Sequence, residues 1–172
     1  MAGAARPRPS HVAGRAVLAA VAALFAFTLD RMTKDFAAAQ ISPAAPVSVI
    51  GEWVRLAHLH NSGTAFGMFP GSAPVLAYVT LPVLAIIGWM YLRGAGDSLL
   101  AIAVLGLVLG AGAGNTLDRA LQGYVEDFID IGLPGGARFW TFNLSDSALV
   151  VGTLSALVPS LRSQRVSVSG RS

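Results

Sequence analysis

The sequence predicts a mainly α-helical integral membrane protein, and three observations support this prediction. Hydrophobic residues make up 54% of the 172 residues, charged residues only 12%, and the mean hydropathy is +0.63. A soluble domain contains about a quarter charged residues, so lipid is the expected solvent for much of this chain. Four apolar segments, at about 14–36, 72–92, 98–117 and 142–161, are long enough to cross a bilayer as helices.

The first segment carries no charge from Ala16 to Leu29, and Asp30 and Lys34 then stand one helical turn apart. This spacing predicts a helix-end ion pair, with Lys34 reaching to the membrane interface; contact with a substrate is the alternative. A cleaved signal peptide is a rival interpretation, because basic Arg15 precedes the apolar run and small residues follow it. The charges between the run and those small residues argue against cleavage.

The segment 40–70 is not a span, because Pro43 and Pro46 interrupt it. Apolar residues among polar ones predict short strands here, and His60-Asn61-Ser62-Gly63 predicts a turn.

The second and third spans, 72–92 and 98–117, flank a tight polar loop at 93–97. The segment 119–141 returns to mixed polarity, and the fourth span, 142–161, follows it. A Pro-Gly-Gly turn lies within the mixed segment.

These spans define a single membrane domain over 13–162, flanked by disordered tails at 1–12 and 163–172. Arginines lie in both tails and in the short loop, whereas the two longer loops contain the acids Glu52, Glu126, Asp127 and Asp130. Because Lys and Arg mark the cytoplasmic side, both termini are expected in the cytoplasm and loops 37–71 and 118–142 outside. The unusual polar residues then gather at one depth, on the outer side.

Two Asn-x-x-Asp elements lie at the edges of apolar runs: Asn115–Asp118 and Asn143–Asp146, with Asp127 between them. An amide beside a carboxylate can hold it by a hydrogen bond, and Asn143 is also placed to cap the fourth helix. Two neighbouring carboxylates share a proton, and the ionised one can activate water. The pattern indicates an aspartate-dyad hydrolase at the bilayer surface, but spacing does not decide which two of the three acids form the dyad.

Other functions remain open at this stage. The three aspartates are also candidate relay sites of a small transporter, although a transporter places such groups near the midplane. Gly106, Gly110 and Gly114 recur every fourth residue and favour close helix packing, so a non-catalytic scaffold is a third interpretation. We expect this packing to bring the fourth span close to the third.

Metal and nucleic-acid functions are not expected. His58 and His60 lie on one side of a predicted strand, but the only other histidine is His11 and the chain has no cysteine, so no zinc site is predicted. The basic residues are thinly spread, and Lys34 is the only lysine.

Five segments, in order along the chain, are similar to the motifs of the signal peptidase II family, the lipoprotein signal peptidases of bacteria. They are Asp30–Lys34, His60–Gly67, Gly114–Arg119, Val125–Ile129 and Phe142–Ser147.

The resemblance implies an aspartic endopeptidase of the bacterial cytoplasmic membrane, with a small extracytoplasmic β-cradle and the active site on the extracytoplasmic side. Its substrate would be a diacylglyceryl-modified prolipoprotein, cleaved before the lipidated cysteine. Membrane lipids would be its other partners, nucleic acid would not, and a monomer without a cofactor is expected.

The resemblance also implies residue roles. Asp127 and Asp146 would be the catalytic dyad, with Asn61 and Gly63 touching substrate near it. The residues that would support and orient the dyad or position the substrate are Asn115, Asp118, Arg119, Asn143, Asp30 and Lys34. Ser145 departs from the family, because alanine is common before the second aspartate.

Overall fold

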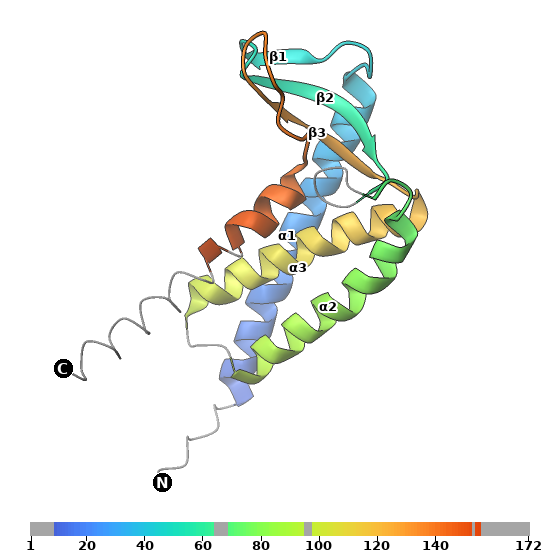
Figure 1. The fold of residues 1–172 in the computed structure, drawn as a ribbon. Helices are drawn as coiled ribbons and strands as arrows, with labels where there is room; N and C mark the ends of the chain where they lie inside the picture. The colour runs from blue at the N-terminus through green and yellow to red at the C-terminus, as the bar shows by residue number, and fades with distance from the viewer. Residues whose placement is uncertain (1–8, 64–68, 95–97, 153, 156–172) are drawn as a thin grey trace, which may run out of the picture.

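The computed structural model describes residues 9–63, 69–94, 98–152 and 154–155 (Figure 1). Its helices and strands are α1 (Pro9–Gln40), β1 (Val47–Ile50), β2 (Val54–Asn61), α2 (Ala73–Gly94), α3 (Leu99–Leu121) and β3 (Val125–Ile131). A further helix covers 144–152. Mainly helical architecture with a small sheet confirms the coarse fold prediction.

The predicted tails fall largely outside this description. Residues 1–8, 163–172 and the end of the fourth predicted span, 156–161, are not described. α1 begins at Pro9, so it includes four residues that were assigned to the amino-terminal tail.

Within the described residues, two helical stretches are long and apolar enough to cross a membrane, Ala13–Gln40 and Leu99–Leu121. The apolar part of α2, Ala73–Ile86, is shorter. α1 has 32 residues. At 1.5 Å per residue it is about 48 Å long, more than the roughly 30 Å of hydrocarbon in a bilayer. Its last turns can therefore stand beyond the hydrocarbon, and those turns carry all of its charges except Arg15.

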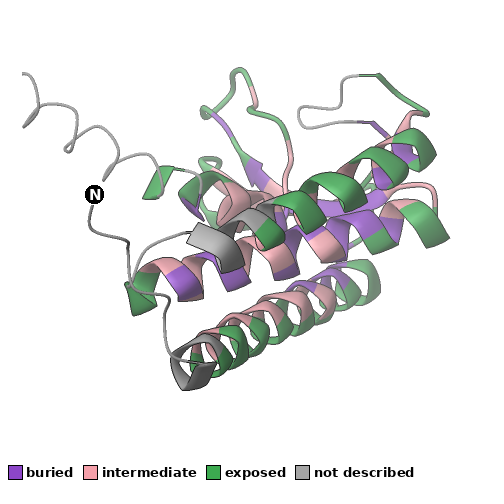
Figure 2. Ribbon diagram, turned by 90° about the horizontal axis from the view of Figure 1, so that it is seen from below, coloured by how far each residue is buried: buried purple, intermediate pink, exposed green. Residues whose placement is uncertain are grey.

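α3 is the central helix, and the helices beside it are largely exposed on their outward faces (Figure 2). Half of the most apolar stretch of α3 is buried, against 6% for α1. Outward apolar side chains that are more than half exposed include Val21, Leu24, Phe25, Tyr78 and Val79. A belt of this kind is costly in water and is the surface expected for a helix in lipid.

The glycines of α3 pack against α1. A side-chain carbon on Gly106 would collide with Ala19, and one on Gly110 would collide with the backbone of Ala23. Gly106 and Gly110 therefore meet small residues of α1. At Gly114 the start of the last helix comes close, as expected: a side-chain carbon there would lie 3.7 Å from Ser145 Oγ, and the next residue, Asn115, bonds to Asp146. The contact with α1 aligns the outer ends of α1 and α3, where the polar residues lie.

The sheet has the order β1-β2-β3 with antiparallel neighbours, and it lies at the end of the helices (Figure 1). β3 was not predicted, because a segment with several acidic residues has the composition of a loop. The prediction that Asn61 and Asp127 lie in loops was therefore wrong, because both lie in strands. β2 continues to Asn61, where a turn was expected, and pairs with β3. Ala37, Ile41 and Phe128 form the buried apolar core that joins α1 to the sheet.

Candidate active site

The site forms where the chain enters its last helix beside β3. Phe142 exchanges backbone hydrogen bonds with Ile129: its N–H donates to the Ile129 carbonyl at 3.0 Å, and its carbonyl accepts from Ile129 N–H at 2.7 Å. This extra pairing carries Asn143 to the edge of β3, within hydrogen-bond distance of Asp127. Segments far apart in sequence thus meet at one point.

Asn143 and Asp146 form a reciprocal cap at the start of the last helix. The side-chain oxygen of Asn143 accepts from Asp146 N–H at 2.9 Å, and Asp146 Oδ2 accepts from Asn143 N–H at 3.1 Å. This is the capping-box arrangement, in which two unpaired helix donors are satisfied together. The capping role predicted for Asn143 is confirmed, and the same bonds fix the Asp146 side chain.

Asp127 is held by two asparagine amides. Asn143 Nδ2 donates to its Oδ1 at 2.8 Å, and Asn61 Nδ2 donates to its Oδ2 at 2.9 Å. Burial, and then the charge of Asp146, raise the pKa of Asp127 to about 7, against the opposing effect of the two amides and Lys34. Asp127 is 2% exposed, so the cost of ionising it is set by its surroundings rather than by water.

Asn115 connects this pair to α1. Its Nδ2 donates to Asp146 Oδ1 at 3.0 Å. Its side-chain oxygen accepts from Lys34 Nζ at 2.7 Å and from Asn143 Nδ2 at 3.2 Å. With these two donors on its oxygen, the Asn115 amide is fixed with its nitrogen toward Asp146.

Lys34 is the buried cation of the site. Its Nζ lies 2.6 Å from Asp30 Oδ2 and 2.8 Å from Asp118 Oδ2, and its side chain is 0% exposed. Arg31 also reaches Asp118, at 2.8 Å. The expectation that Lys34 extends to the interface was therefore wrong, because three acceptors inside the protein take its three protons.

A second arginine reaches the site from α3. Arg119 donates to the Asn115 and Gly63 carbonyls, both at 3.3 Å, and Gly63 N–H donates to the Asn61 side chain at 2.9 Å. Arg119 thereby connects α3 to the turn that follows β2. The adjoining residues of the predicted motif, 64–67, lie outside the described residues.

Two contacts that hold Asp30 in the site were not predicted from the sequence. Ser145 N–H donates to Asp30 Oδ1 at 3.2 Å, tying the start of the last helix to α1. Gly114 lies directly against Asp30, so a larger residue there would displace the carboxylate. The contact of Ser145 is a backbone contact, and no side-chain pattern signals it.

Comparison with known proteins decides the family. The pattern described as "Signal peptidase (SPase) II" matches residues 22–162. The lipoprotein signal peptidase of Moorella thermoacetica is 35% identical over 133 residues, 77% of this chain and 85% of that protein. That of Streptomyces coelicolor is 36% identical over 153 residues, 86% of this chain and 71% of that protein.

The chain belongs to the signal peptidase II family. It is therefore a membrane aspartic peptidase, and the transporter and scaffold interpretations fall away. A solved structure described as a bacterial membrane enzyme, at 2.3 Å resolution, has a TM-score of 0.77 and 26% identity, covering 85% of this chain and 88% of that one. A second such structure, at 1.9 Å, has a TM-score of 0.73 and 26% identity, covering 83% and 92%.

The salt bridges separate the acids of this signal peptidase II site into two groups. Asp30 and Asp118 pair with Lys34, whereas the described residues contain no salt bridge to Asp127 or Asp146. The paired acids are neutralised by an adjacent cation. Asp127 and Asp146 accept only amide and backbone N–H groups, which orient a carboxyl group and leave its proton free to exchange.

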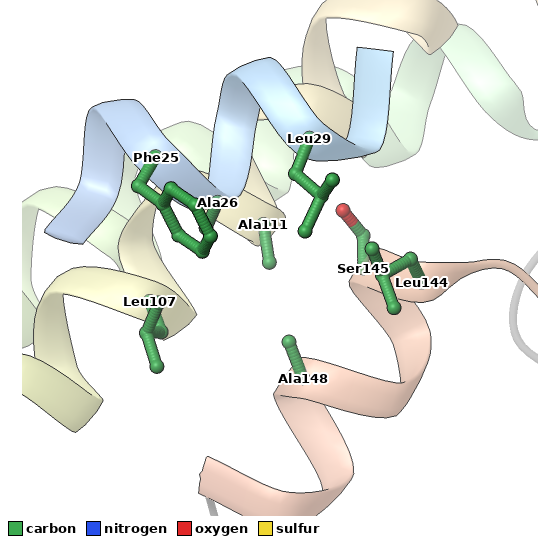
Figure 3. A pocket seen from close by; sticks show the side chains of 8 residues that line it. All are labelled: Phe25, Ala26, Leu29, Leu107, Ala111, Leu144, Ser145 and Ala148. Carbon is green, nitrogen blue, oxygen red and sulfur yellow. The ribbon is translucent and has the colours of Figure 1, made fainter. Parts of the chain in front are cut away.

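An apolar cavity of about 150 Å³ lies beside this site, between α1, α3 and the last helix (Figure 3). Its lining includes Phe25, Leu29, Leu107 and Leu144, and Ser145 stands at the end nearest the acids. The cavity places hydrocarbon surface directly beside the buried polar network.

Proposed function

We propose that Asp127 and Asp146 are the catalytic dyad with which this signal peptidase removes the signal peptide from diacylglyceryl-modified prolipoproteins, cutting before the lipidated cysteine. One observation carries this proposal: two carboxylates, Asp127 buried and Asp146 half-buried, have no salt bridge among the described residues and are both hydrogen-bonded to Asn143.

The dyad would work by general acid–base catalysis. With a pKa near 7, Asp127 holds a proton at neutral pH and can polarise the scissile carbonyl. Asp146 is then the ionised partner that takes a proton from the attacking water. Since the two titrate as a coupled pair, the observable pH profile belongs to the dyad rather than to one residue.

The surrounding amides orient the two acids. Asn61 and Asn143 hold the two oxygens of Asp127, and Asn115 together with the Asn143 backbone holds those of Asp146. All four oxygens therefore face N–H donors. A carboxylate pair held in this way needs no metal for its chemistry, so we expect a chelator to leave cleavage intact.

The supporting residues would divide between structure and substrate. Asp30, Lys34 and Asp118 form the buried ionic cluster behind Asn115 and act as positioning residues. Gly63, with Arg119 behind its carbonyl, would lie along the substrate backbone near the cleavage point.

The apolar cavity supports a lipid-bearing substrate. Part of an acyl chain or an apolar side chain of the signal peptide fits a cleft of this size lined by hydrocarbon, with Ser145 at one end (Figure 3). A soluble peptide would leave this surface unoccupied.

We further propose four membrane spans, with both termini in the cytoplasm and the sheet as an extracytoplasmic cradle. α1, α2, α3 and the helix that begins at 144 all meet the sheet at one end (Figure 1). The arginine-rich ends of the chain favour the cytoplasm for the opposite side. A monomer suffices, because one chain supplies every residue of the proposed site.

The decisive experiment uses purified full-length protein in detergent with a diacylglyceryl-modified precursor. Asp127→Asn and Asp146→Asn should each lower the cleavage rate by about a thousandfold or more while the protein still inserts and folds. Asp35→Asn is the matched control, because this carboxylate is 58% exposed and pairs only with Arg31 among the described residues. Cleavage at the wild-type rate by either dyad variant would overturn the assignment.

A further inference from the structure

A second cluster of ionisable side chains lies on the sheet and has no part in the proposed mechanism. His58 and His60 come from β2, and Glu126 comes from β3, where it is the register partner of His60. Glu126 Oε1 lies 2.9 Å from His60 Nε2, and Oε2 lies 3.0 Å from His58 Nε2. One ligand atom from each of the three residues lies within 4.8 Å of the other two.

The tautomer of His58 is set by its other nitrogen. Nδ1 lies 3.1 Å from the carbonyl oxygen of Ile41, just after α1, and a carbonyl can only accept. Nδ1 therefore carries the proton, and in the neutral ring Nε2 presents a lone pair. A histidine oriented by a backbone carbonyl in this way is the usual arrangement of a metal ligand.

The His58 lone pair faces another acceptor. An ionised Glu126 side chain has no proton to donate, and both His58 Nε2 and Glu126 Oε2 are buried without a hydrogen-bond partner. Two acceptors held together out of water are unfavourable unless a cation lies between them.

We propose that His58, His60 and Glu126 form a binding site for a divalent transition metal of the zinc type. Two imidazoles and one carboxylate are a suitable donor set, and three protein ligands leave a fourth position open to water. Ligands about 2.0 to 2.1 Å from zinc stand roughly 3.3 Å apart in a tetrahedron. The two nitrogen–oxygen separations, 2.9 and 3.0 Å, need to widen by only a few tenths of an ångström, and all three ligand atoms lie within 4.8 Å of one another.

A single metal ion satisfies this cluster better than protons do. Protonating both rings would place two imidazolium groups side by side, with ring centroids 5.1 Å apart, against one carboxylate. One divalent ion instead pairs with all three donors at once. His60 also stacks on Tyr124 with centroids 4.0 Å apart, which limits its rotation and holds it beside Glu126.

The metal site and the dyad lie on opposite faces of the sheet. Successive strand residues point to opposite sides, so Glu126 and His60 face away from their neighbours Asp127 and Asn61. A bound metal would therefore join β2, β3 and, through Ile41, the end of α1 without touching the reacting groups. Its effect is on stability, which separates this inference from the proposed catalytic function.

The test is a zinc titration of the full-length protein, without a polyhistidine tag, in detergent. We expect about one zinc per chain and a higher melting temperature with Zn²⁺ but not with Mg²⁺, which prefers oxygen ligands. His60→Gln and Glu126→Gln should each weaken binding at least about tenfold and remove the thermal shift. His11→Gln is the control, because it removes the one other histidine of the chain.

A His60 variant tests metal binding with less risk to folding than a His58 variant. The His60 side chain is 52% exposed, whereas His58 makes the hydrogen bond to the Ile41 carbonyl. Zinc affinity should also fall as the pH is lowered, because protons compete for the imidazoles. The inference is overturned if His60→Gln and Glu126→Gln bind zinc as well as the wild type, or if His11→Gln abolishes binding. It is equally overturned if zinc leaves the melting temperature unchanged. The cluster would then be only an ion pair between the histidines and Glu126.

Discussion

Replacing Lys34 by methionine tests the buried ionic cluster most directly. Methionine has a similar length and is apolar, so the change removes the charge with little change in volume. Asp30 would lose its ion pair at 2.6 Å, Asp118 would lose one at 2.8 Å, and Asn115 would lose one of the two donors to its side-chain oxygen. Asp30 and Asp118 are 2% and 3% exposed, so water cannot replace the ammonium group.

Removing one partner of a buried ion pair costs about 3 to 5 kcal/mol, because an uncompensated charge stays behind. Asp118 keeps Arg31 and Asp30 keeps the Ser145 N–H, which favours the lower end of that range. For a chain of this length each kcal/mol lowers the melting temperature by about 2 to 4 °C. We therefore expect a decrease of roughly 6 to 12 °C.

The assay is thermal unfolding of the purified protein in detergent, with cleavage measured on the same samples. Arg31→Met is the control: its side chain is 39% exposed, so its ion pairs should contribute less than about 1 kcal/mol. The double variant Asp30→Asn with Lys34→Met should recover part of the loss. Equal melting temperatures for Lys34→Met and Arg31→Met, or for Lys34→Met and the wild type, would refute the reasoning.

Three further predictions concern the dyad and its support. The pKa of Asp127 is raised from 3.8 to about 7, so the folded state binds the proton of this residue more tightly than the unfolded state does. The free energy of unfolding is therefore highest below about pH 4 and falls by roughly 4 kcal/mol as the pH rises to about 7. Asp127→Asn should therefore melt progressively higher relative to the wild type between pH 5 and pH 8, and a constant difference would contradict the burial argument. Asn61→Ala removes a hydrogen bond that lowers this pKa, so the alkaline limb of the pH profile of kcat/KM should move to higher pH; an unchanged limb would count against the contact. Gly110→Ala should lower both the melting temperature and activity, because it separates α3 from α1. Gly14 has open space around it, so the control Gly14→Ala should be neutral or slightly stabilising. Equal effects of the two substitutions would exclude the packing explanation.

The sequence predicted where the apolar helices lie. A run of uncharged residues, such as the one that ends at Leu29, has few alternatives to a helix in lipid, because every backbone donor must be satisfied internally. Asn143 was identified as a cap from its position alone, since capping depends on local geometry. The segments that resemble the family pointed to Asp127 and Asp146.

β3 shows where prediction from sequence failed. Its acids, Glu126, Asp127 and Asp130, give it the polarity of a loop, and only pairing with β2 makes it a strand. Each acid has a partner that lies far away in sequence: Asp130 pairs with Arg55, for example, at 2.6 Å. Because this pairing could not be predicted, Asn61 and Asp127 were placed in loops. The cluster around Glu126 was not predicted for the same reason.

By itself the sequence determined the solvent of this protein, the positions of its helices and the residue types available for chemistry, because hydropathy and capping act over a few neighbouring residues. Only the tertiary structure decided which acids are neutralised and which are not. Lys34 pairs with Asp30 one helical turn away, as the spacing predicts, but its second carboxylate, Asp118, is brought to it by the contact of α1 with the glycines of α3. Within the part of the chain that the structure describes, Asp127 and Asp146 are left with amide partners, and this charge separation depends on distances that no local pattern encodes.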